Sequence, residues 1–300
     1  MADEFERLYA GKHSIVQELF IKTADENYVT ARFCFAHELN VDFFWNAVHG
    51  LEKYLKAALL LSGRSGKDFT VAGKRRLFNH NIAELFAEVR PLAPERIPTR
   101  LVRPNVLPEP YWYEEPTEHF ITRLYNMGNE HNRYQLTGYV CRSEDLLKLD
   151  QVIFAIRRLC QPLEVHFLGQ KRDGVPDESI RQRLDKDHPL SSNLHSTFEK
   201  IRDGERGPFL REIALNWNLP FAPAGYSHPP FGYGTSSANP VLVRRILEPL
   251  DSGDAQQAAD SDELWQWAQD NIFIPREYVK AYNDERLRRK AAAVRPKDKV

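Results

Sequence analysis

Two long amphipathic helices between Lys22 and Leu61 constrain the fold more than any other part of the chain. In the first, apolar residues recur at the spacing of one α-helical face: Ala24, Tyr28, Ala31, Phe35 and Leu39. The second carries a matching stripe: Phe44, Val48, Leu51, Leu55 and Ala58. The two segments meet near residues 40–42, so the sequence predicts an antiparallel helical hairpin and a mainly α fold.

The opposite face of the second predicted helix is polar and carries His49, Glu52, Lys53 and Lys56. Glu52 precedes Lys56 by four residues, the orientation in which an ion pair stabilises a helix. We take Lys53 as a candidate ligand-binding residue. His49, beside it on this face, is expected to be merely exposed.

Three further helices are predicted before residue 163. Asn81 with Glu84 resembles a capping box and starts a short helix that runs to about Val89. Thr117 is expected to cap a fourth helix that reaches about Tyr139, and a fifth helix follows from Ser143 to Pro162. The inner stripe of the fourth helix is Phe120, Leu124, Met127, His131 and Tyr134.

The connection between the third and fourth helices is rich in proline. Seven prolines between Pro91 and Pro116 rule out a regular helix there. The connection is longer than most loops, which indicates a functional lid or an interface arm. The connection before the third helix, Ser62 to Asn79, is expected to be a polar, basic loop containing Lys67, Lys74, Arg75 and Arg76.

The remaining residues are expected to be largely helical and rich in loops. Helices are predicted at 189–203, 208–217, 242–247 and 263–271 and from Arg276 onward, with an irregular stretch at 219–240. Residues 13–162 therefore form one expected domain. Residues 163–300 form either a second helical domain or a set of helices packed on the first.

Two segments resemble the HEPN domain family. These are AVHGLEKYLKAALLLSG, at 47–63, and HNIAELFAEV, at 80–89, where Asn81 replaces the usual Asp. The resemblance covers about residues 13–162. It implies an up-and-down helical bundle with a short third helix, a homodimer, and a link to RNA or nucleotides.

Ribonucleases of this family carry Arg, four to six residues and then His on the fourth helix, and this chain departs from that pattern. No His follows Arg133 before Tyr139. Arg133 remains a candidate phosphate contact, because a guanidinium can hold two phosphate oxygens. We place Asn126 and Glu130 on the same flank, with an internal Arg133–Glu130 ion pair as the alternative reading.

Two histidines complete the candidate ligand-binding residues. His131 lies on the predicted apolar stripe, so we expect a histidine of the core, with a ligand contact as the alternative. His80 precedes a helix start, where it can reach a ligand or help to cap the helix.

Composition excludes several classes of function. Lys and Arg number 41 against 42 acidic residues, so overall charge gives no argument for nucleic-acid binding. No metal-ligand cluster, phosphate-loop motif or serine-nucleophile signature is present, so neither a metal nor a cofactor is expected. The three scattered cysteines, Cys34, Cys141 and Cys160, are expected to be buried. Without a predicted signal peptide or membrane-spanning segment, a cytoplasmic protein is expected.

Three functions remain open. The leading one is non-catalytic binding of RNA, a nucleotide or a partner protein. The second is a metal-independent endoribonuclease that uses Arg133 with His80 or His131. The third is an interaction module that docks a partner through Tyr111–Tyr113 and Phe221–Tyr233. Apolar residues outside the main stripes favour a homodimer: Phe33, Cys34, Phe43 and Trp45.

Overall fold

The computed structural model describes residues 12–132, 138–163, 179, 181–182, 204, 207–222, 225–229, 236–237, 242–271 and 274–293. The described chain is mainly α, as the sequence predicts. It divides into a first unit, Met1–Asn129 with Cys141–Thr235, and a second unit, Glu130–Val140 with Ser236–Val300. This division differs from the boundary at residues 162 and 163 expected from the sequence.

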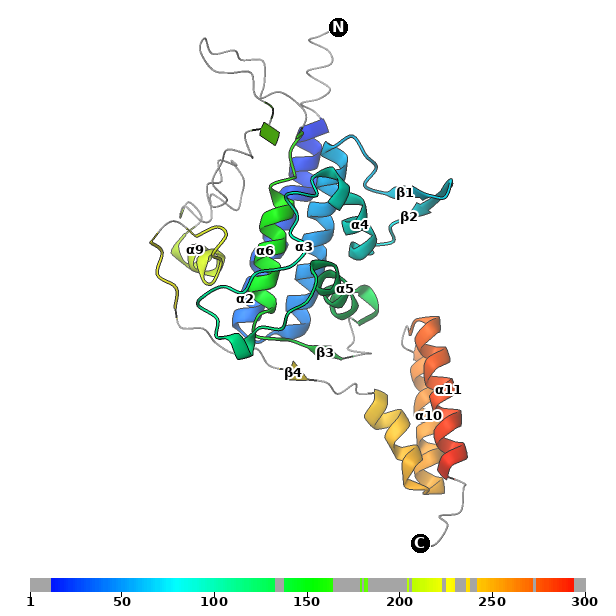
Figure 1. The fold of residues 1–300 in the computed structure, drawn as a ribbon. Helices are drawn as coiled ribbons and strands as arrows, with labels where there is room; N and C mark the ends of the chain where they lie inside the picture. Colours follow the sequence, from blue (N-terminus) through cyan, green and yellow to red (C-terminus); the bar gives the residue numbers. More distant parts are fainter. Residues whose placement is uncertain are drawn as a thin grey trace, which may run out of the picture. The chain divides into compact units, whose positions relative to one another are not determined.

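The first unit is a helical bundle with α3 at its centre (Figure 1). Helix α3 packs against α2, α4, α5 and α6, and α9 packs against α2. A π-helical turn at Gln17–Ile21 precedes α2. The helices are α2 (Lys22–Ala36), α3 (Asn40–Leu61), α4 (Ile82–Val89), α5 (Thr117–Gly128), α6 (Asp145–Arg157) and α9 (Pro208–Leu215).

The predicted hairpin of two helices is present as α2 and α3. All five residues of the predicted stripe on α3 are buried: Phe44, Val48, Leu51, Leu55 and Ala58. On α2, Ala24, Tyr28 and Ala31 are buried, whereas Leu39 lies beyond the helix and is 46% exposed. All three cysteines are buried and unbridged, as expected.

Charged side chains also lie inside the bundle, in two similar groups. Arg157 on α6 donates from Nε to Oδ1 of Asp25 at 2.7 Å, and the Tyr54 hydroxyl donates to the same carboxylate at 2.5 Å. Arg32 and Tyr28 on α2 both donate to Asp150 on α6. All six side chains belong to residues that are at most 2% exposed. A buried charge needs such partners, so these groups hold α2, α3 and α6 together.

The basic loop expected at 62–79 is instead largely an antiparallel β-hairpin, and this prediction was wrong. Strand β1 (Asp68–Val71) pairs with β2 (Lys74–Leu77). Ala72 and Gly73 between them both have positive φ, 49° and 74°. Two such residues form the turn whose twist suits a two-residue hairpin. The usual Asn-Gly or Asp-Gly signal is absent, which is why the sequence did not indicate it.

Helix α4 begins where the sequence predicts. The Asn81 side chain accepts hydrogen bonds from the backbone N–H groups of Ala83 and Glu84, at 3.0 and 3.3 Å. Thr117 was expected to cap the next helix in the same way. It is instead the first residue of α5, and its hydroxyl donates to the Pro98 carbonyl at 2.7 Å.

The prediction that the fourth helix reaches Tyr139 was wrong. Helix α5 ends at Gly128, and Asn129 is extended, with ψ 166°. A Cβ atom on Gly128 would lie 2.2 Å from the Phe44 carbonyl oxygen, so the backbones of α5 and α3 approach very closely there. A short 3₁₀ turn, Glu130–Asn132, follows.

The second unit is a small helical assembly. Its helical segments are Glu130–Asn132, η5 (Val243–Leu247), η6 (Glu248–Ser252), α10 (Ala255–Asn271) and α11 (Arg276–Ala293). Strands β3 (Tyr139–Val140) and β4 (Ser236–Ser237) pair antiparallel. Its core is built from Ile246, Leu247, Trp265, Ala268, Ile274 and Tyr282.

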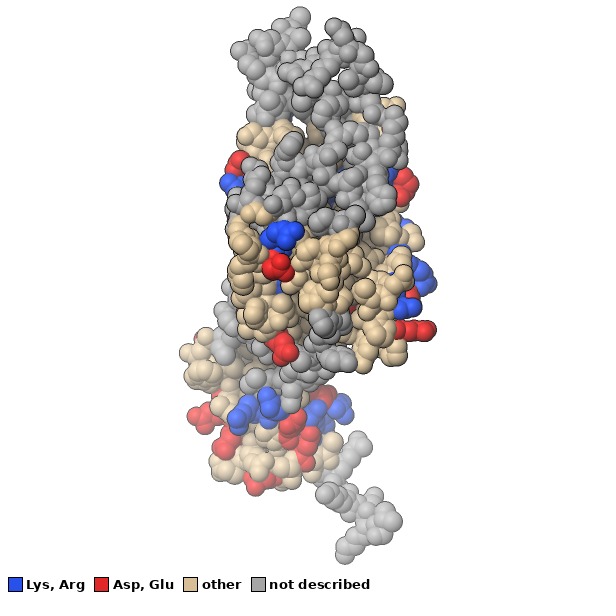
Figure 2. Space-filling view, turned by 90° about the vertical axis from the view of Figure 1, so that its left-hand side faces the viewer, with Lys and Arg blue, Asp and Glu red and all other residues tan. Residues whose placement is uncertain are grey.

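The helices predicted for the second half of the chain are confirmed in part. Helices α9 and α11 start at Pro208 and Arg276 as predicted, while α10 begins eight residues earlier than the expected 263. The segment at 242–247 is a π-helical turn. The helix expected at 189–203 lies outside the described residues. Figure 2 shows acidic and basic side chains interspersed over the helices of the second unit.

Candidate functional site

A polar surface runs along one side of α3 in the first unit. Residues at helical spacings of three and four supply it from α3: Asn46, His49, Glu52, Lys53 and Lys56. Asn27 on α2 and His80, just before α4, complete it. We refer to these seven residues as the α3 polar surface.

Glu52 is the centre of this surface and is only 5% exposed. Its Oε1 atom lies 2.5 Å from Nζ of Lys56 and 2.9 Å from Nδ1 of His80. His49 Nδ1 lies 3.8 Å from the other carboxylate oxygen. Burial alone would raise the pKa of Glu52, but the hydrogen bonds and charges of Lys56 and His80 outweigh it and hold the pKa below its usual value. Glu52 is therefore an anion at neutral pH.

Lys53 is held by amides rather than by a carboxylate. Its Nζ atom donates to Oδ1 of Asn27 at 2.6 Å, and Nδ2 of Asn27 donates to Oδ1 of Asn46 at 3.0 Å. Among the described residues no carboxylate oxygen lies within ion-pairing distance of Lys53. Desolvation by partial burial lowers the pKa of Lys53, against the opposing charges of Glu52 and Glu26. An ammonium group has three donors, so Lys53 keeps capacity for an anion.

His80 reaches this surface through an unusual backbone conformation. Asn79 and His80 both have positive φ, 45° and 64°. Such conformations are uncommon for residues other than glycine, although Asn and His adopt them more often than most. Because the ionised Glu52 carboxylate can only accept, the Nδ1 atom of His80 carries the proton of their hydrogen bond. In the neutral ring, Nε2 is then an acceptor, and the side chain is 64% exposed.

The arrangement can bind an anion and can move a proton. Lys53 and Lys56 are half-buried cations on consecutive turns of α3, and His80 is an exposed ring fixed by a carboxylate. Cations of this kind suit phosphate oxygens. Among the described residues no group of three or more His, Cys, Asp or Glu is placed to hold a metal ion.

Two of the six predicted site residues belong to the α3 polar surface, where His80 contacts Glu52 and Lys53 contacts Asn27. Asn126 is on α5 with an exposed side chain, and no polar contact joins it to that surface in the part of the chain that the structure describes. Glu130 and His131 lie beyond the end of α5, in the second unit. His131 is a half-buried residue in a 3₁₀ turn and not part of an apolar helical stripe, so that interpretation was wrong. Arg133 lies outside the described residues.

The sequence did not single out Glu52 and Asn27 as site residues. The spacing of Glu52 and Lys56 indicated an ion pair, and that pair is present at 2.5 Å. Contacts of Glu52 with His80 and of Lys53 with Asn27 join residues 28 and 26 positions apart. Periodicity within one helix cannot indicate them.

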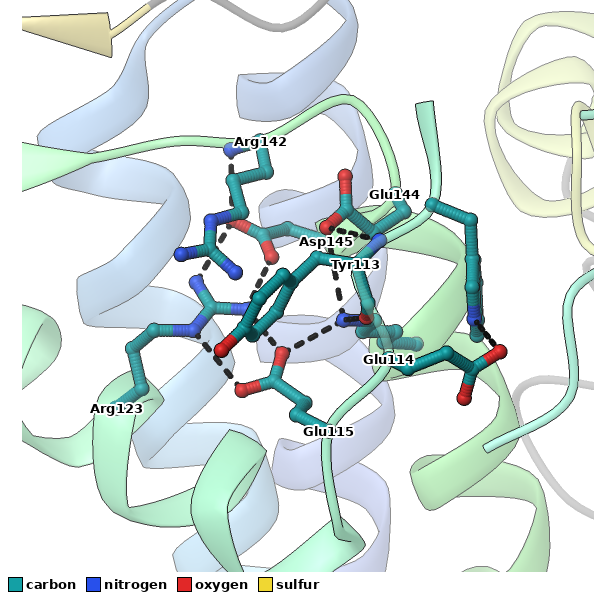
Figure 3. A network of polar contacts seen from close by, with 9 residues as sticks. Tyr113, Glu114, Glu115, Arg123, Arg142, Glu144 and Asp145 are labelled. Atoms are coloured by element: carbon teal, nitrogen blue, oxygen red, sulfur yellow. Dashed lines mark hydrogen bonds and ion pairs between the residues drawn. The ribbon is translucent and has the colours of Figure 1, made fainter. Parts of the chain in front are cut away.

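A second polar network fixes the proline-rich connection to the bundle (Figure 3). Lys148 on α6 donates to Oε1 of Glu115 and to the Tyr113 carbonyl, each at 2.6 Å. Arg123 on α5 donates to Glu115 at 2.8 Å and to Asp145 at 2.6 Å. These contacts pair each cation with carboxylates, and the Lys148 and Asp145 side chains are fully buried.

We call this network the clamp, because its contacts hold the proline-rich connection in place and do not form a binding site. Its charged groups satisfy one another, which leaves little capacity for a substrate. Arg142 stacks over the Tyr113 ring at 4.2 Å, and Lys148 lies 5.0 Å from the centre of the Trp112 ring. The proline-rich connection, expected to be a lid or an interface arm, is thus anchored at its C-terminal end.

No helix among the described residues combines the length and the apolar character needed to cross a membrane. Comparison with known proteins gives no relative from which a function can be carried over. The sequence matches no family model, and neither the curated proteins nor the solved structures contain a match.

Proposed function

We propose that this chain is a HEPN-like binding protein that engages RNA or a nucleotide through phosphate, without cleaving it. The proposal rests on the resemblance of residues 47–63 and 80–89 to that family and on the α3 polar surface, to which these two segments contribute five of the seven residues.

Lys53 carries the proposal. It is a half-buried cation held by the Asn27 amide, and no carboxylate of the described chain pairs with it. Lys56 on the next turn and His80 flank Glu52. A phosphate that binds Lys53 would gain a charge-assisted hydrogen bond at a position that is already partly desolvated.

The test is fluorescence anisotropy with labelled single-stranded RNA and with a labelled adenine nucleotide, for Lys53→Gln against wild type. We expect the variant to bind about 10- to 100-fold more weakly, since hydrogen bonds to charged groups contribute about 1.5–3 kcal/mol. Lys22→Gln on α2 is the matched control, because Lys22 pairs with Glu18 at the surface. Equal affinities of Lys53→Gln and wild type for both ligands would refute the proposed site.

A homodimer is part of the proposal through the family resemblance alone. Cys34 and Phe43, two of the residues expected to form an apolar interface, are buried within the bundle. Phe33 packs near Phe209 of α9, with ring centres 6.3 Å apart. The apolar side chains thus give less support for a homodimer than the sequence indicated. Light scattering at tens of micromolar tests the dimer, and a monomer mass would exclude it.

A partner protein remains the alternative ligand. Tyr111 and Tyr113 are 36% and 55% exposed and can contact a partner. Phe221, expected in a second docking segment, is 1% exposed and packs against Phe154. Of that second segment, residues 223–224 and 230–233 lie outside the described residues.

One observation favours a second function, a metal-independent endoribonuclease. His80 is held at Nδ1 by Glu52, which leaves Nε2 able to take the proton of a ribose 2′-hydroxyl. The 2′-oxygen would then attack the adjacent phosphorus, forming a cyclic phosphate and releasing the 5′-oxygen, which takes up a proton. Cleavage of RNA in the presence of EDTA, abolished by His80→Gln, would establish this function. Intact RNA with wild-type protein would exclude it.

A further inference from the structure

The β1–β2 hairpin extends away from the bundle beside α4 (Figure 1). Every residue from Thr70 to Leu77 is exposed, so the bundle does not use the end of the hairpin for packing. The base is anchored by Phe78, which is 1% exposed and stacks on Phe69 with ring centres 4.7 Å apart. An exposed arm with a fixed base is a surface without an evident structural role.

The charge of this arm is concentrated and largely unneutralised. Residues 64–76 contain five Lys or Arg and one Asp, so they carry +4 in a chain whose formal charge is −1. Arg64 pairs with Glu88, and Arg75 pairs with Asp68. In contrast, Lys67, Lys74 and Arg76 have no carboxylate partner among the described residues.

The basic end of α11 is different. Arg286 and Lys290 both pair with Asp262, and Arg289 pairs with Asp251 and Glu285. Its cations are therefore already compensated within the second unit. Of the two basic segments, the hairpin retains more free charge for a partner.

The strand register sorts the hairpin residues onto two faces. Phe69 lies opposite Arg76, and Val71 lies opposite Lys74. Because side chains alternate along a strand, these four residues share one face, while Asp68, Thr70, Arg75 and Leu77 share the other. The first face combines a half-buried aromatic ring with two cations that pair with no described carboxylate.

We infer that the face formed by Phe69, Val71, Lys74 and Arg76 binds single-stranded RNA, with phosphates at Lys74 and Arg76 and a base against the side of the Phe69 ring that does not stack on Phe78. This inference rests on the proposed function and adds a second contact outside the α3 polar surface. Surfaces that bind single strands combine basic residues along the backbone path with aromatic rings on which bases stack. A membrane surface fits less well, because Val71 is the one exposed apolar side chain among the four residues of this face. Proteins that lie on a membrane bury a larger apolar surface in it.

The test compares three variants of the full chain by anisotropy with labelled single-stranded RNA over a range of salt concentrations. The double variant Lys74→Gln/Arg76→Gln removes both proposed phosphate contacts. We expect its affinity to fall roughly tenfold and its log–log salt slope to fall by about 1.4, twice the 0.7 expected for one phosphate contact. Arg75→Gln is the matched control, since it removes a charge from the same strand on the opposite face. Lys53→Gln reports on the proposed function.

The outcomes separate the two proposals. The inference is supported if the double variant loses RNA affinity while Arg75→Gln binds RNA nearly as well as wild type. Nucleotide binding should be unchanged in all hairpin variants. Wild-type RNA affinity in the double variant, with weak binding by Lys53→Gln, overturns the hairpin site alone. An equal loss in Arg75→Gln overturns the assignment to one face. If wild type binds neither RNA nor nucleotide, the proposed function fails and the inference fails with it. Binding to anionic vesicles but not to RNA would identify a membrane surface instead.

Discussion

The Nζ atom of Lys148 lies 2.6 Å from Oε1 of Glu115, and both side chains are nearly inaccessible to solvent, at 0% and 6% exposure. Glu115 lies near the end of the proline-rich connection and Lys148 lies within α6, so this pair joins an irregular segment to a helix of the bundle. Glu144 contributes a second carboxylate at 3.5 Å. Buried charges are tolerated when their partners satisfy them, and they become costly when one partner is lost.

Removing Lys148 should therefore destabilise the protein strongly. We expect Lys148→Met to lower the free energy of unfolding by about 3–5 kcal/mol. The buried Glu115 carboxylate would lose one of its two cations, and the Tyr113 carbonyl would lose the hydrogen bond that Lys148 donates. Urea unfolding measures the change. Lys280→Met, at a side chain that is 81% exposed, is the control and should shift stability by less than about 0.5 kcal/mol. Similar values for both variants would contradict the assigned role of the clamp.

The Asp25–Arg157 pair predicts a coupling that can be measured. Arg157→Met leaves the Asp25 carboxylate buried without this cation, although the neutral Tyr54 hydroxyl still donates to it, and should cost about 3–5 kcal/mol. Asp25→Asn removes the charge that Arg157 compensates. The double variant should therefore be less destabilised than the sum of the two single variants, by about 0.5–3 kcal/mol in a double-mutant cycle. Additive effects would show that the two side chains are not energetically coupled.

Much of the fold could be predicted because its signals are local. The stripe on α3 and the Asn81 cap of α4 each depend on residues within one helix, and both are confirmed. The close approach of Gly128 to Phe44 could not be predicted, because it joins two helices that are far apart in the sequence. The buried Asp25–Arg157 pair joins residues 132 positions apart, so no local pattern indicates it.

The candidate site shows the same limit. Lys53 and the Glu52–Lys56 pair follow from helical spacing, and both are present on one face of α3. The position of His80 over Glu52 depends on the left-handed backbone at Asn79 and His80, which the sequence does not signal. The charge of the hairpin was visible as a basic loop. Its division into two faces required the strand register.

Gly128 should be intolerant of a side chain. A Cβ atom there would lie 2.2 Å from the Phe44 oxygen and 2.7 Å from Cγ2 of Val48, so α5 would have to move away from α3. We expect Gly128→Ala to cost at least about 1–3 kcal/mol, the usual range for overpacking. Gly50→Ala is the control within α3. Its Cβ would meet its neighbours at 3.4 Å or more, and alanine favours a helix by about 0.5–1 kcal/mol, so stability should hold or rise. Equal losses of stability in the two variants would contradict an unusually close approach of α5 to α3 at Gly128.

The pH dependence of stability provides the last prediction. The pKa of Glu52 in the folded protein lies below its usual value, despite the opposing effect of burial, because Lys56 and His80 stabilise the carboxylate. A lowered folded-state pKa means that ionised Glu52 stabilises the fold above the unfolded pKa, about 4.3 for glutamate. This contribution is lost as the pH falls from about 4.3 through the folded-state pKa.

The comparison of wild type with Glu52→Gln isolates this effect from other carboxylates, including Glu115, whose pKa is also lowered against the effect of burial by hydrogen bonds from Arg123 and Lys148. Wild type should be the more stable protein at pH 6, and the difference should shrink as the pH falls below about 4.3, because protonated Glu52 no longer attracts Lys56. Urea unfolding between pH 3 and 6 measures it. Glu38→Gln is the control, since Glu38 is exposed and makes no ion pair with a described residue. A difference between wild type and Glu52→Gln that stays constant over this range would show that the Glu52 carboxylate does not stabilise the fold through its charge.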